Sequence, residues 1–413
     1  MQPSGLNYLN ADNILALITS LFICCNPIAW ALYFIPGGLI SIIGFIWIIY
    51  LFTRLYFHKS VVSISVISLS LIIILIFIFD FIFGTTGKYY WTYLIGFMGF
   101  GILGLQLGYC VKDIKRIISY VAWIGVILAP FIFTLDMGKT DTGGDDYGRW
   151  MGVSYGILRF IIALIIYLCC YKPKKITKII FSLFLLGYSV FYLIFASRGA
   201  ILAIGLLGLF IWIGNSSKNQ SEIIWKLCLI TIFAIGCGLL FKEIIIVCVN
   251  IVESFGIDTF SFEKMLMLIE TNDLSNGRSA LYEDAMMGIS NSPLFGNGIA
   301  TFEKIHQIYI HNLFLQIWYE LGVIPTILSL MLLGYSLYLI FNIQTKIHIK
   351  VFLEFILCAG IVELIFSSSF WISHQFWIWI GFSIRLILLR HKVATNNHIK
   401  ISFNEYPKSL ILP

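Results

Sequence analysis

The chain has 413 residues, of which 59% are hydrophobic and only 12% are charged. A soluble globular protein carries about 25% charged residues, so a soluble enzyme, a secreted disulfide scaffold, a disordered chain and a coiled coil are excluded. The composition predicts an all-α polytopic membrane protein, because short alternating strands typical of a membrane barrel do not occur. The net charge of +6 is assigned to cytoplasmic loops and not to nucleic acid.

Twelve apolar runs follow one another along the chain. They predict about 12 transmembrane helices in a single integral membrane domain covering residues 1–413. The nine cysteines show no spacing typical of a metal or redox site. The runs cover residues 13–34, 37–57, 61–83, 91–111, 117–135, 153–171, 179–196, 200–214, 223–249, 321–341, 351–366 and 371–389.

The basic residues gather in alternate gaps between these runs. Lys112, Lys115 and Arg116 follow the fourth run, for example, and four lysines within residues 172–178 follow the sixth. Because short basic loops stay in the cytoplasm, every even-numbered helix is predicted to end there, and both termini are predicted to be cytoplasmic. The gaps after the odd-numbered helices are then extracytoplasmic.

Two of the extracytoplasmic gaps are long enough to be real loops. Residues 136–152 hold four aspartates, and the adjacent Asp145 and Asp146 leave a divalent-cation site open as an alternative to a solvated loop. Residues 252–310, between the ninth and tenth helices, form the one large loop. Within it a helix is expected over 279–290, followed by a turn at Gly296-Asn297-Gly298, which lacks the strand and spacing of a dinucleotide fingerprint.

Three arginines stand near the outer ends of predicted helices, where basic residues are disfavoured. Arg198 lies at the tip of the hairpin between the seventh and eighth helices. Its side chain either reaches lipid headgroups or binds a phosphate through two hydrogen bonds from its planar guanidinium group. Arg149 and Arg159 lie in the outer loop and in the outer half of the sixth helix, and Arg149 has Asp145 and Asp146 as alternative partners.

Arg278 is one of few basic residues in the large acidic loop, and it directly precedes the helix expected there. It is a candidate for binding an anion. The alternative is a salt bridge at the helix start with Glu283 or Asp284.

His311 lies where the large loop leads into the tenth helix. A histidine with an ordinary pKa near 6.5 is the usual general base at neutral pH. Asn312 is its neighbour, and Gln316 and Glu320 would follow at one-turn intervals if the segment is helical. The alternative is a structural histidine. Zinc is not expected, because no third ligand stands at a recognisable spacing from His306 and His311.

Together these residues form three short patterns that occur in a fixed order within residues 195–330. The ordered set, with one large outer loop late in a twelve-helix chain, resembles the O-antigen polymerase and O-antigen ligase superfamily. The patterns are Ser197-Arg198-Gly199-Ala200, then Gly277-Arg278 followed by Asn291-Ser292-Pro293-Leu294-Phe295-Gly296-Asn297-Gly298, then His311-Asn312 with Gln316, Glu320 and Gly322.

The resemblance implies a metal-independent glycosyltransferase without a cofactor, facing the periplasm in the bacterial inner membrane. Its donor would be an undecaprenyl-pyrophosphate-linked oligosaccharide. Arg198 and Arg278, with Arg149 as a looser match, would bind the pyrophosphate. His311 would be the catalytic residue at the acceptor hydroxyl, and Asn312 and Glu320 are predicted to contact substrate.

Attack opposite the leaving group predicts inversion at the anomeric carbon. The turn and the His-Asn-Leu-Phe-Leu-Gln run resemble polymerases, which extend lipid-linked repeat units, more than ligases, which transfer glycan to lipid A core. A chain-length regulator and a flippase are the partners that the family implies. Two alternatives stay open, a lipid-linked oligosaccharide transporter and a metal-dependent glycosyltransferase using Asp145 and Asp146.

Overall fold

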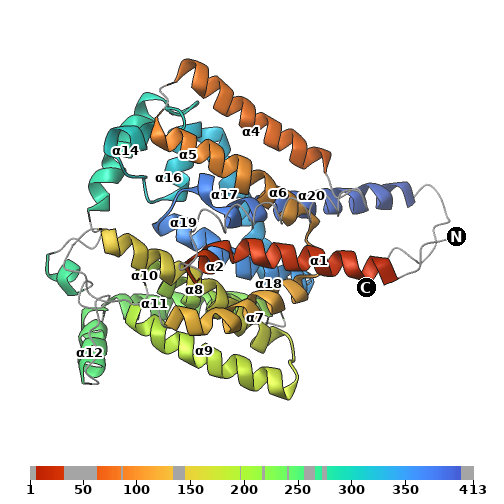
Figure 1. The fold of residues 1–413 in the computed structure, drawn as a ribbon, viewed down its shortest axis with the longest axis vertical. Helices are drawn as coiled ribbons and strands as arrows, with labels where there is room; N and C mark the ends of the chain where they lie inside the picture. The colour runs from red at the N-terminus through yellow and green to blue at the C-terminus, as the bar shows by residue number, and fades with distance from the viewer. Residues whose placement is uncertain are drawn as a thin grey trace.

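The computed structural model describes residues 6–31, 63–84, 87–133, 145–195, 197–215, 219–239, 241–254, 266–271 and 277–400. All regular structure within these residues is helical (Figure 1). Two π-helical segments, η1 (Phe97–Gly101) and η3 (Leu357–Ile361), interrupt long helices, a third, η2 (Ile211–Asn215), ends one, and a short 3₁₀ turn, η4 (Phe370–Ile372), stands between two helices. The α-helices are α1 (Leu6–Ile23), α2 (Cys25–Ala31), α4 (Ile64–Phe83), α5 (Lys88–Gly96), α6 (Ile102–Cys110), α7 (Ile114–Phe133), α8 (Asp145–Cys170), α9 (Lys175–Phe195), α10 (Arg198–Phe210), α11 (Gln220–Leu239), α12 (Phe241–Glu253), α14 (Arg278–Asn291), α15 (Thr301–His306), α16 (Leu313–Leu321), α17 (Val323–Phe341), α18 (Ile347–Ile356), α19 (Val362–Phe366) and α20 (His374–Lys400).

The chain is a polytopic membrane protein, as its composition predicts. Among the described residues, six helices are long and apolar enough to cross a membrane, and two apolar helices are shorter. The six are Ile64–Phe83, Lys88–Cys110, Ile114–Phe133, Gly152–Cys170, Lys175–Tyr192 and Val323–Phe341, and the shorter two are Asp12–Ile23 and Arg198–Gly214. Fewer long spans are therefore seen than the twelve predicted.

The difference has identifiable local causes. The predicted helix over residues 37–57 lies outside the described residues. The run 223–249 is divided between α11 and α12, directly after Gly236 and Gly238, which weaken a helix. The run 351–366 consists of α18, η3 and α19 in succession.

The predicted outer loop over residues 136–152 is partly wrong, because α8 already begins at Asp145. Two aspartates in its first turn favour this start, since negative charge is stabilising at a helix N-terminus. Arg149 therefore lies on a helix and not in a loop. Its side chain, and those of Asp145 and Asp146, are outside the described residues.

The two ends of the bundle differ. α1 begins and α20 ends at one end, whereas α14 runs across the opposite end, which we call the α14 end (Figure 1). The helices nearest the two termini therefore meet the same end of the bundle, as the charge pattern requires. The assignment of that end to the cytoplasm stays a prediction.

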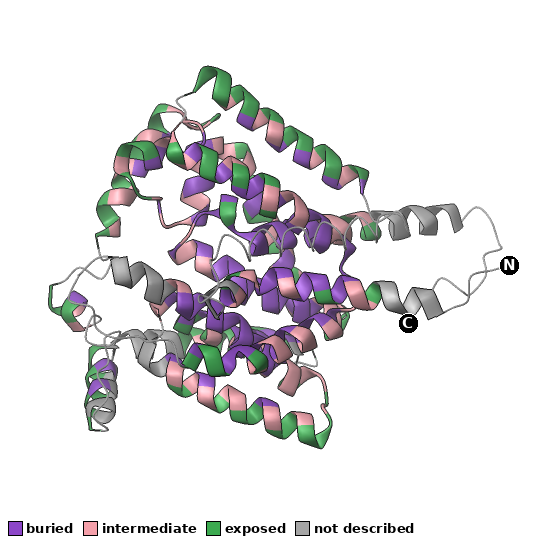
Figure 2. Ribbon diagram, in the orientation of Figure 1, coloured by how far each residue is buried: buried purple, intermediate pink, exposed green. Residues whose placement is uncertain are grey.

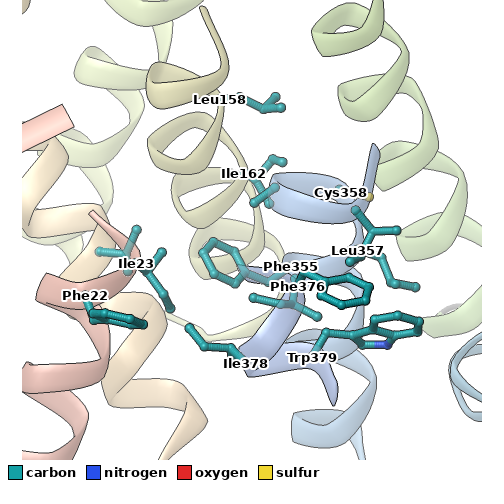
Figure 3. Close-up of a cluster of buried hydrophobic side chains, with 14 of the residues drawn as sticks. Phe22, Ile23, Leu158, Ile162, Phe355, Leu357, Cys358, Phe376, Ile378 and Trp379 are labelled. Atoms are coloured by element: carbon teal, nitrogen blue, oxygen red, sulfur yellow. The ribbon is translucent and has the colours of Figure 1, made fainter. Parts of the chain in front are cut away.

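Burial separates a packed centre from lipid-facing edges. α4 and α9 lie at opposite edges and expose large apolar side chains, among them Leu75, Phe79 and Leu183 (Figures 1 and 2). α8 is mostly buried from Gly152 to Cys170, and its Leu158 and Ile162 lie in the same cluster as Phe355 and Phe376 (Figure 3). Such a distribution suits a bundle whose outer helices are solvated by lipid.

α6 and α20 pack closely against each other. A Cβ atom on Gly108 would collide with the carbonyl of Ile378, and one on Gly381 with the carbonyl of Leu105. Small residues at a membrane helix interface let two backbones approach, which increases van der Waals contact where no hydrophobic effect acts between the helices. The glycines thereby fix α20 against α6.

Candidate functional site

The hairpin tip that carries Arg198 is held against two other helices. Ser197 precedes α10, and its N–H donates to Ser154 Oγ of α8 at 3.0 Å. Gly199 is buried so tightly that a Cβ there would collide with the Tyr155 hydroxyl and lie 2.9 Å from the ring of Phe366. Half-buried Arg198 therefore starts α10 in a backbone position fixed by α8 and α19.

Arg278 is the first residue of α14, and Gly277 before it has a left-handed backbone with φ 77°. The helix predicted over 279–290 is thus confirmed. Arg278 is half-buried and makes no ion pair with a described residue. Asp284, one of its two expected partners, lies 3.7 Å from His306 Nδ1 instead. The structure does not support the salt-bridge alternative for Arg278.

His311 lies between α15 and α16 and also has a left-handed backbone, with φ 59°. Its ring centroid is 4.1 Å from that of Tyr309, and the Tyr282 hydroxyl donates to its carbonyl at 3.3 Å. Burial, and secondly the charge of Arg278, lower the pKa of His311 to about 4, although a hydrogen bond to the Phe366 backbone acts in the other direction. The imidazole is therefore neutral at pH 7 and able to accept a proton. Its Nδ1 is buried without a partner among the described residues.

These three segments converge around Phe366 at the end of α19. Gly199 packs on the Phe366 ring, and the Phe366 backbone is near enough to the imidazole of His311 to influence its pKa. The Tyr309 hydroxyl lies 3.2 Å from Ser367 Oγ, which ties the His311 loop to the same place. Arg278 is near enough for its charge to act on both His311 and the Tyr155 hydroxyl. We call Gly199, Tyr309, His311, Phe366 and Ser367, with Arg278 and Tyr155 beside them, the Phe366 cluster.

Asn312 has a local structural role. It is the N-cap of α16, and its Oδ1 accepts hydrogen bonds from the backbone N–H of Phe314 and of Leu315, both at 3.1 Å. An N-cap of this kind stabilises a helix by about 1 kcal/mol. A substrate contact for Asn312 stays a prediction, as does one for Arg149.

Glu320 lies in a buried polar network next to the cluster. Gln316 Nε2 donates to Glu320 Oε1 at 3.0 Å and to Glu303 Oε1 at 3.3 Å, while the Tyr93 hydroxyl donates to Glu303 Oε1 at 2.7 Å. The Trp371 indole N–H donates to Glu320 Oε2. Burial raises the pKa of both carboxyl groups, and the charge of Glu303 raises that of Glu320 further. Glu320 is thus engaged inside the protein, and its predicted substrate contact has no direct support.

Arg159 forms an internal ion pair. It is 2% exposed, and its Nη2 lies 3.3 Å from Glu363 Oε2 on α19, while its Nη1 donates to the Ile23 carbonyl at 3.1 Å. The pair holds α8 to α19, the helix that ends at Phe366.

The Gly296-Asn297-Gly298 segment is a turn, as predicted. Gly296 and Gly298 have φ of 78° and 94°. The Gly298 N–H donates to the carbonyl of Glu320 at 3.2 Å, which satisfies a carbonyl at the end of α16. Asp80, an acidic residue inside a membrane span, accepts the N–H of Ile299 at 2.6 Å, so this turn gives it a partner.

Sequence reasoning missed Tyr155, Phe366 and Ser367. Tyr155 and Phe366 lie inside apolar runs and look like ordinary packing residues. Only the tertiary contacts with Gly199 and His311 mark them, so no signal in the sequence could have found them. No group of three or more His, Cys, Asp or Glu side chains within the described part of the chain is arranged to hold a metal ion.

The comparison with protein families found a match within this chain. Residues 189–330 match the model of the family described as O-Antigen ligase. The matched segment holds Arg198, Arg278 and His311 but ends before Phe366. The search of curated proteins found no match. The resemblance inferred from the three patterns is therefore confirmed for this segment.

Proposed function

On the premise that residues 189–330 match the O-Antigen ligase family, we propose that the protein is a surface-polysaccharide polymerase. It transfers an undecaprenyl-pyrophosphate-linked glycan to the non-reducing-end hydroxyl of the next lipid-linked repeat unit. The reaction takes place at the outer face of the bacterial inner membrane. The observation that carries the proposal is the convergence of the Arg198, Arg278 and His311 segments at the Phe366 cluster.

The division of roles follows from the chemistry of the groups. His311 takes the proton of the acceptor hydroxyl as the hydroxyl oxygen forms a bond to the anomeric carbon. The bond from that carbon to the lipid pyrophosphate breaks, and the pyrophosphate leaves with the electron pair. Arg198 and Arg278 stabilise its charge through bidentate hydrogen bonds, so the leaving group needs no proton. Displacement in one step inverts the anomeric configuration.

Arg278 couples donor binding to the strength of the base. In the free protein its charge lowers the pKa of His311. A pyrophosphate bound to Arg278 offsets that charge, so the pKa of His311 rises when the donor is in place. Because general-base catalysis is most efficient when the pKa lies near the working pH, the histidine becomes a better base in the complex than in the free enzyme.

The same residues would serve a ligase, so the distinction from a polymerase rests on the resemblance of the turn and of the segment after His311. Surface polysaccharide on a gel tests it, in a host that lacks this protein and is complemented with wild type, His311→Ala or His306→Ala. His306 is a matched control, because it stacks on Phe302 at 4.2 Å and pairs with Asp284 outside the Phe366 cluster.

A polymerase gives a ladder with wild type and with His306→Ala, and core bearing one repeat unit with His311→Ala. Core without any repeat, with lipid-linked polymer accumulating, identifies a ligase instead. A normal ladder from His311→Ala, with the variant present in the membrane, refutes the role of His311 and favours the transporter alternative. Retained anomeric configuration in purified product refutes displacement in one step.

A further inference from the structure

The turn that follows α14 exposes two large apolar side chains. Leu294 is 60% exposed and Phe295 is 86% exposed. They belong to the large loop, which the sequence assigns to the aqueous side of the membrane. Large apolar side chains that are adjacent and this exposed indicate a surface that something else covers.

The backbone of this turn is fixed against the start of a membrane span. The carbonyl of Pro293 accepts the N–H of Val323, the first residue of α17, at 3.1 Å. A Cβ on Gly322 would collide with the carbonyl of Leu294. Leu294 and Phe295 therefore lie at the level where α17 enters the membrane, and Ile324 in the first turn of that helix is itself 63% exposed.

A second span ends beside the same turn. Asp80, in the last turn of α4, accepts the N–H of Ile299 at 2.6 Å. Phe79 and Phe83 at this end of α4 are 64% and 73% exposed, as is expected for side chains that face lipid. The apolar turn is thus bounded by the lipid-facing ends of two membrane helices.

We propose that Leu294 and Phe295 insert into the bilayer leaflet at the α14 end and make residues 293–295 a membrane anchor of the large loop. Bilayer lipid is the occupant, because the exposed apolar surface is continuous with the lipid-facing ends of α4 and α17. Aromatic side chains are favoured at the membrane–water interface. Glu283, in the first half of α14, is exposed and charged, whereas Met286 and Met287 in its second half are 44% and 61% exposed, so the apolar surface extends from the turn onto the adjoining part of α14.

The anchor has a consequence for the site. α14 has 14 residues and runs across the end of the bundle, with Arg278 at its beginning and the anchor just beyond its end (Figure 1). Fixing one end of a rigid helix in the leaflet limits how far its other end can lift from the membrane. If the proposed function holds, this keeps Arg278 at the depth of a lipid pyrophosphate.

Photocrosslinking of the full chain tests the anchor without any activity assay. A benzophenone amino acid replaces Phe295, Ile324 or Glu283 in separate variants, and each is reconstituted in vesicles of phosphatidylethanolamine and phosphatidylglycerol without lipid-linked glycan. Ile324 is the matched positive control, because it is exposed on a membrane span, and Glu283 is the water-facing control. After illumination, mass spectrometry detects phospholipid adducts.

We expect phospholipid adducts from the variants at positions 295 and 324, and none from the variant at position 283. Adducts at 324 with none at 295 overturn the proposal. An adduct at 295 that appears only after lipid-linked donor is added, or that joins two protein chains, overturns it as well, because the turn would then bind the donor tail or another copy. None of these outcomes depends on whether the protein is a polymerase, so failure of the anchor and failure of the proposed function are separable.

Discussion

The electrostatic coupling of Arg278 to His311 gives a quantitative prediction about pH. A pKa of about 4 for His311 leaves only about 0.1% of the imidazole protonated at pH 7, against about a quarter at the ordinary value of 6.5. Because only the neutral ring accepts a proton, activity is lost as the pH falls through this pKa. In the free enzyme we expect kcat/KM to stay constant from neutral pH to about pH 5 and to fall below it.

Changing Arg278 should move this acid limb. Arg278→Gln removes the positive charge that helps to lower the pKa of His311, so the limb shifts to higher pH, whatever the variant loses in absolute rate. Arg278→Lys is the matched control, since it keeps the charge and should keep the limb near its wild-type position. In the wild type, kcat, which reports the enzyme–substrate complex, should fall at a higher pH than kcat/KM, because bound pyrophosphate offsets the charge of Arg278.

The assay uses purified protein in proteoliposomes with a lipid-linked repeat unit, and chromatography of the extended products across the pH range. Nitrogen NMR of labelled histidine, assigned by comparison with His311→Asn, measures the pKa of the ring directly and without substrate. Two results would refute the reasoning. One is a fall in the wild-type kcat/KM that is centred near pH 6.5, and the other is a fall at the same pH in Arg278→Gln and in wild type. Either result would mean that burial and Arg278 do not control the ionisation of His311.

Three further predictions concern the scaffold and the chemistry. Gly108→Val should destabilise the protein by about 1–3 kcal/mol in a detergent melt, because α6 and α20 must separate, whereas Gly205→Ala should be neutral, since its Cβ meets nothing within 4 Å. Arg159→Met leaves Glu363, whose side chain is 17% exposed, without its partner and should cost about 3 kcal/mol in the same melt. Adding Glu363→Gln should recover part of that loss, and an unchanged melting temperature for Arg159→Met would contradict an energetic role for the pair. A chelator should leave glycan transfer unchanged, and loss of activity that a divalent cation restores would favour the metal-dependent alternative.

The membrane class and much of the local structure could be predicted from the sequence. Low charge and long apolar runs exclude any fold that must face water on all sides. The helix over 279–290 and the turn at Gly296-Asn297-Gly298 follow from local signals, since Pro293 and the two glycines after it disfavour continuation of the helix. The break before α12 and the early start of α8 were missed, because helix ends depend on small differences in local free energy.

The site itself was only partly visible in the sequence. Arg198, Arg278 and His311 stand out because charge and an ionisable ring are rare in such a chain. Their meeting point, Phe366, is an apolar residue in an apolar run, and only the packing of α10 and of the segment before α16 against α19 reveals it. The burial of Glu320 could not be predicted from the sequence either. It depends on packing against Glu303, which lies 17 positions earlier in the chain.

By itself, the sequence determined that the chain crosses the membrane repeatedly, where its turns lie and which few polar residues are candidates for chemistry. These properties depend on composition and on neighbours a few residues apart. The tertiary structure alone decided that His311 is held neutral beside Arg278, that Arg159 pairs with Glu363 and that Leu294 and Phe295 lie beside the ends of two spans. Each of these depends on contacts between segments far apart in the chain, whose free energy exists only once the helices have packed.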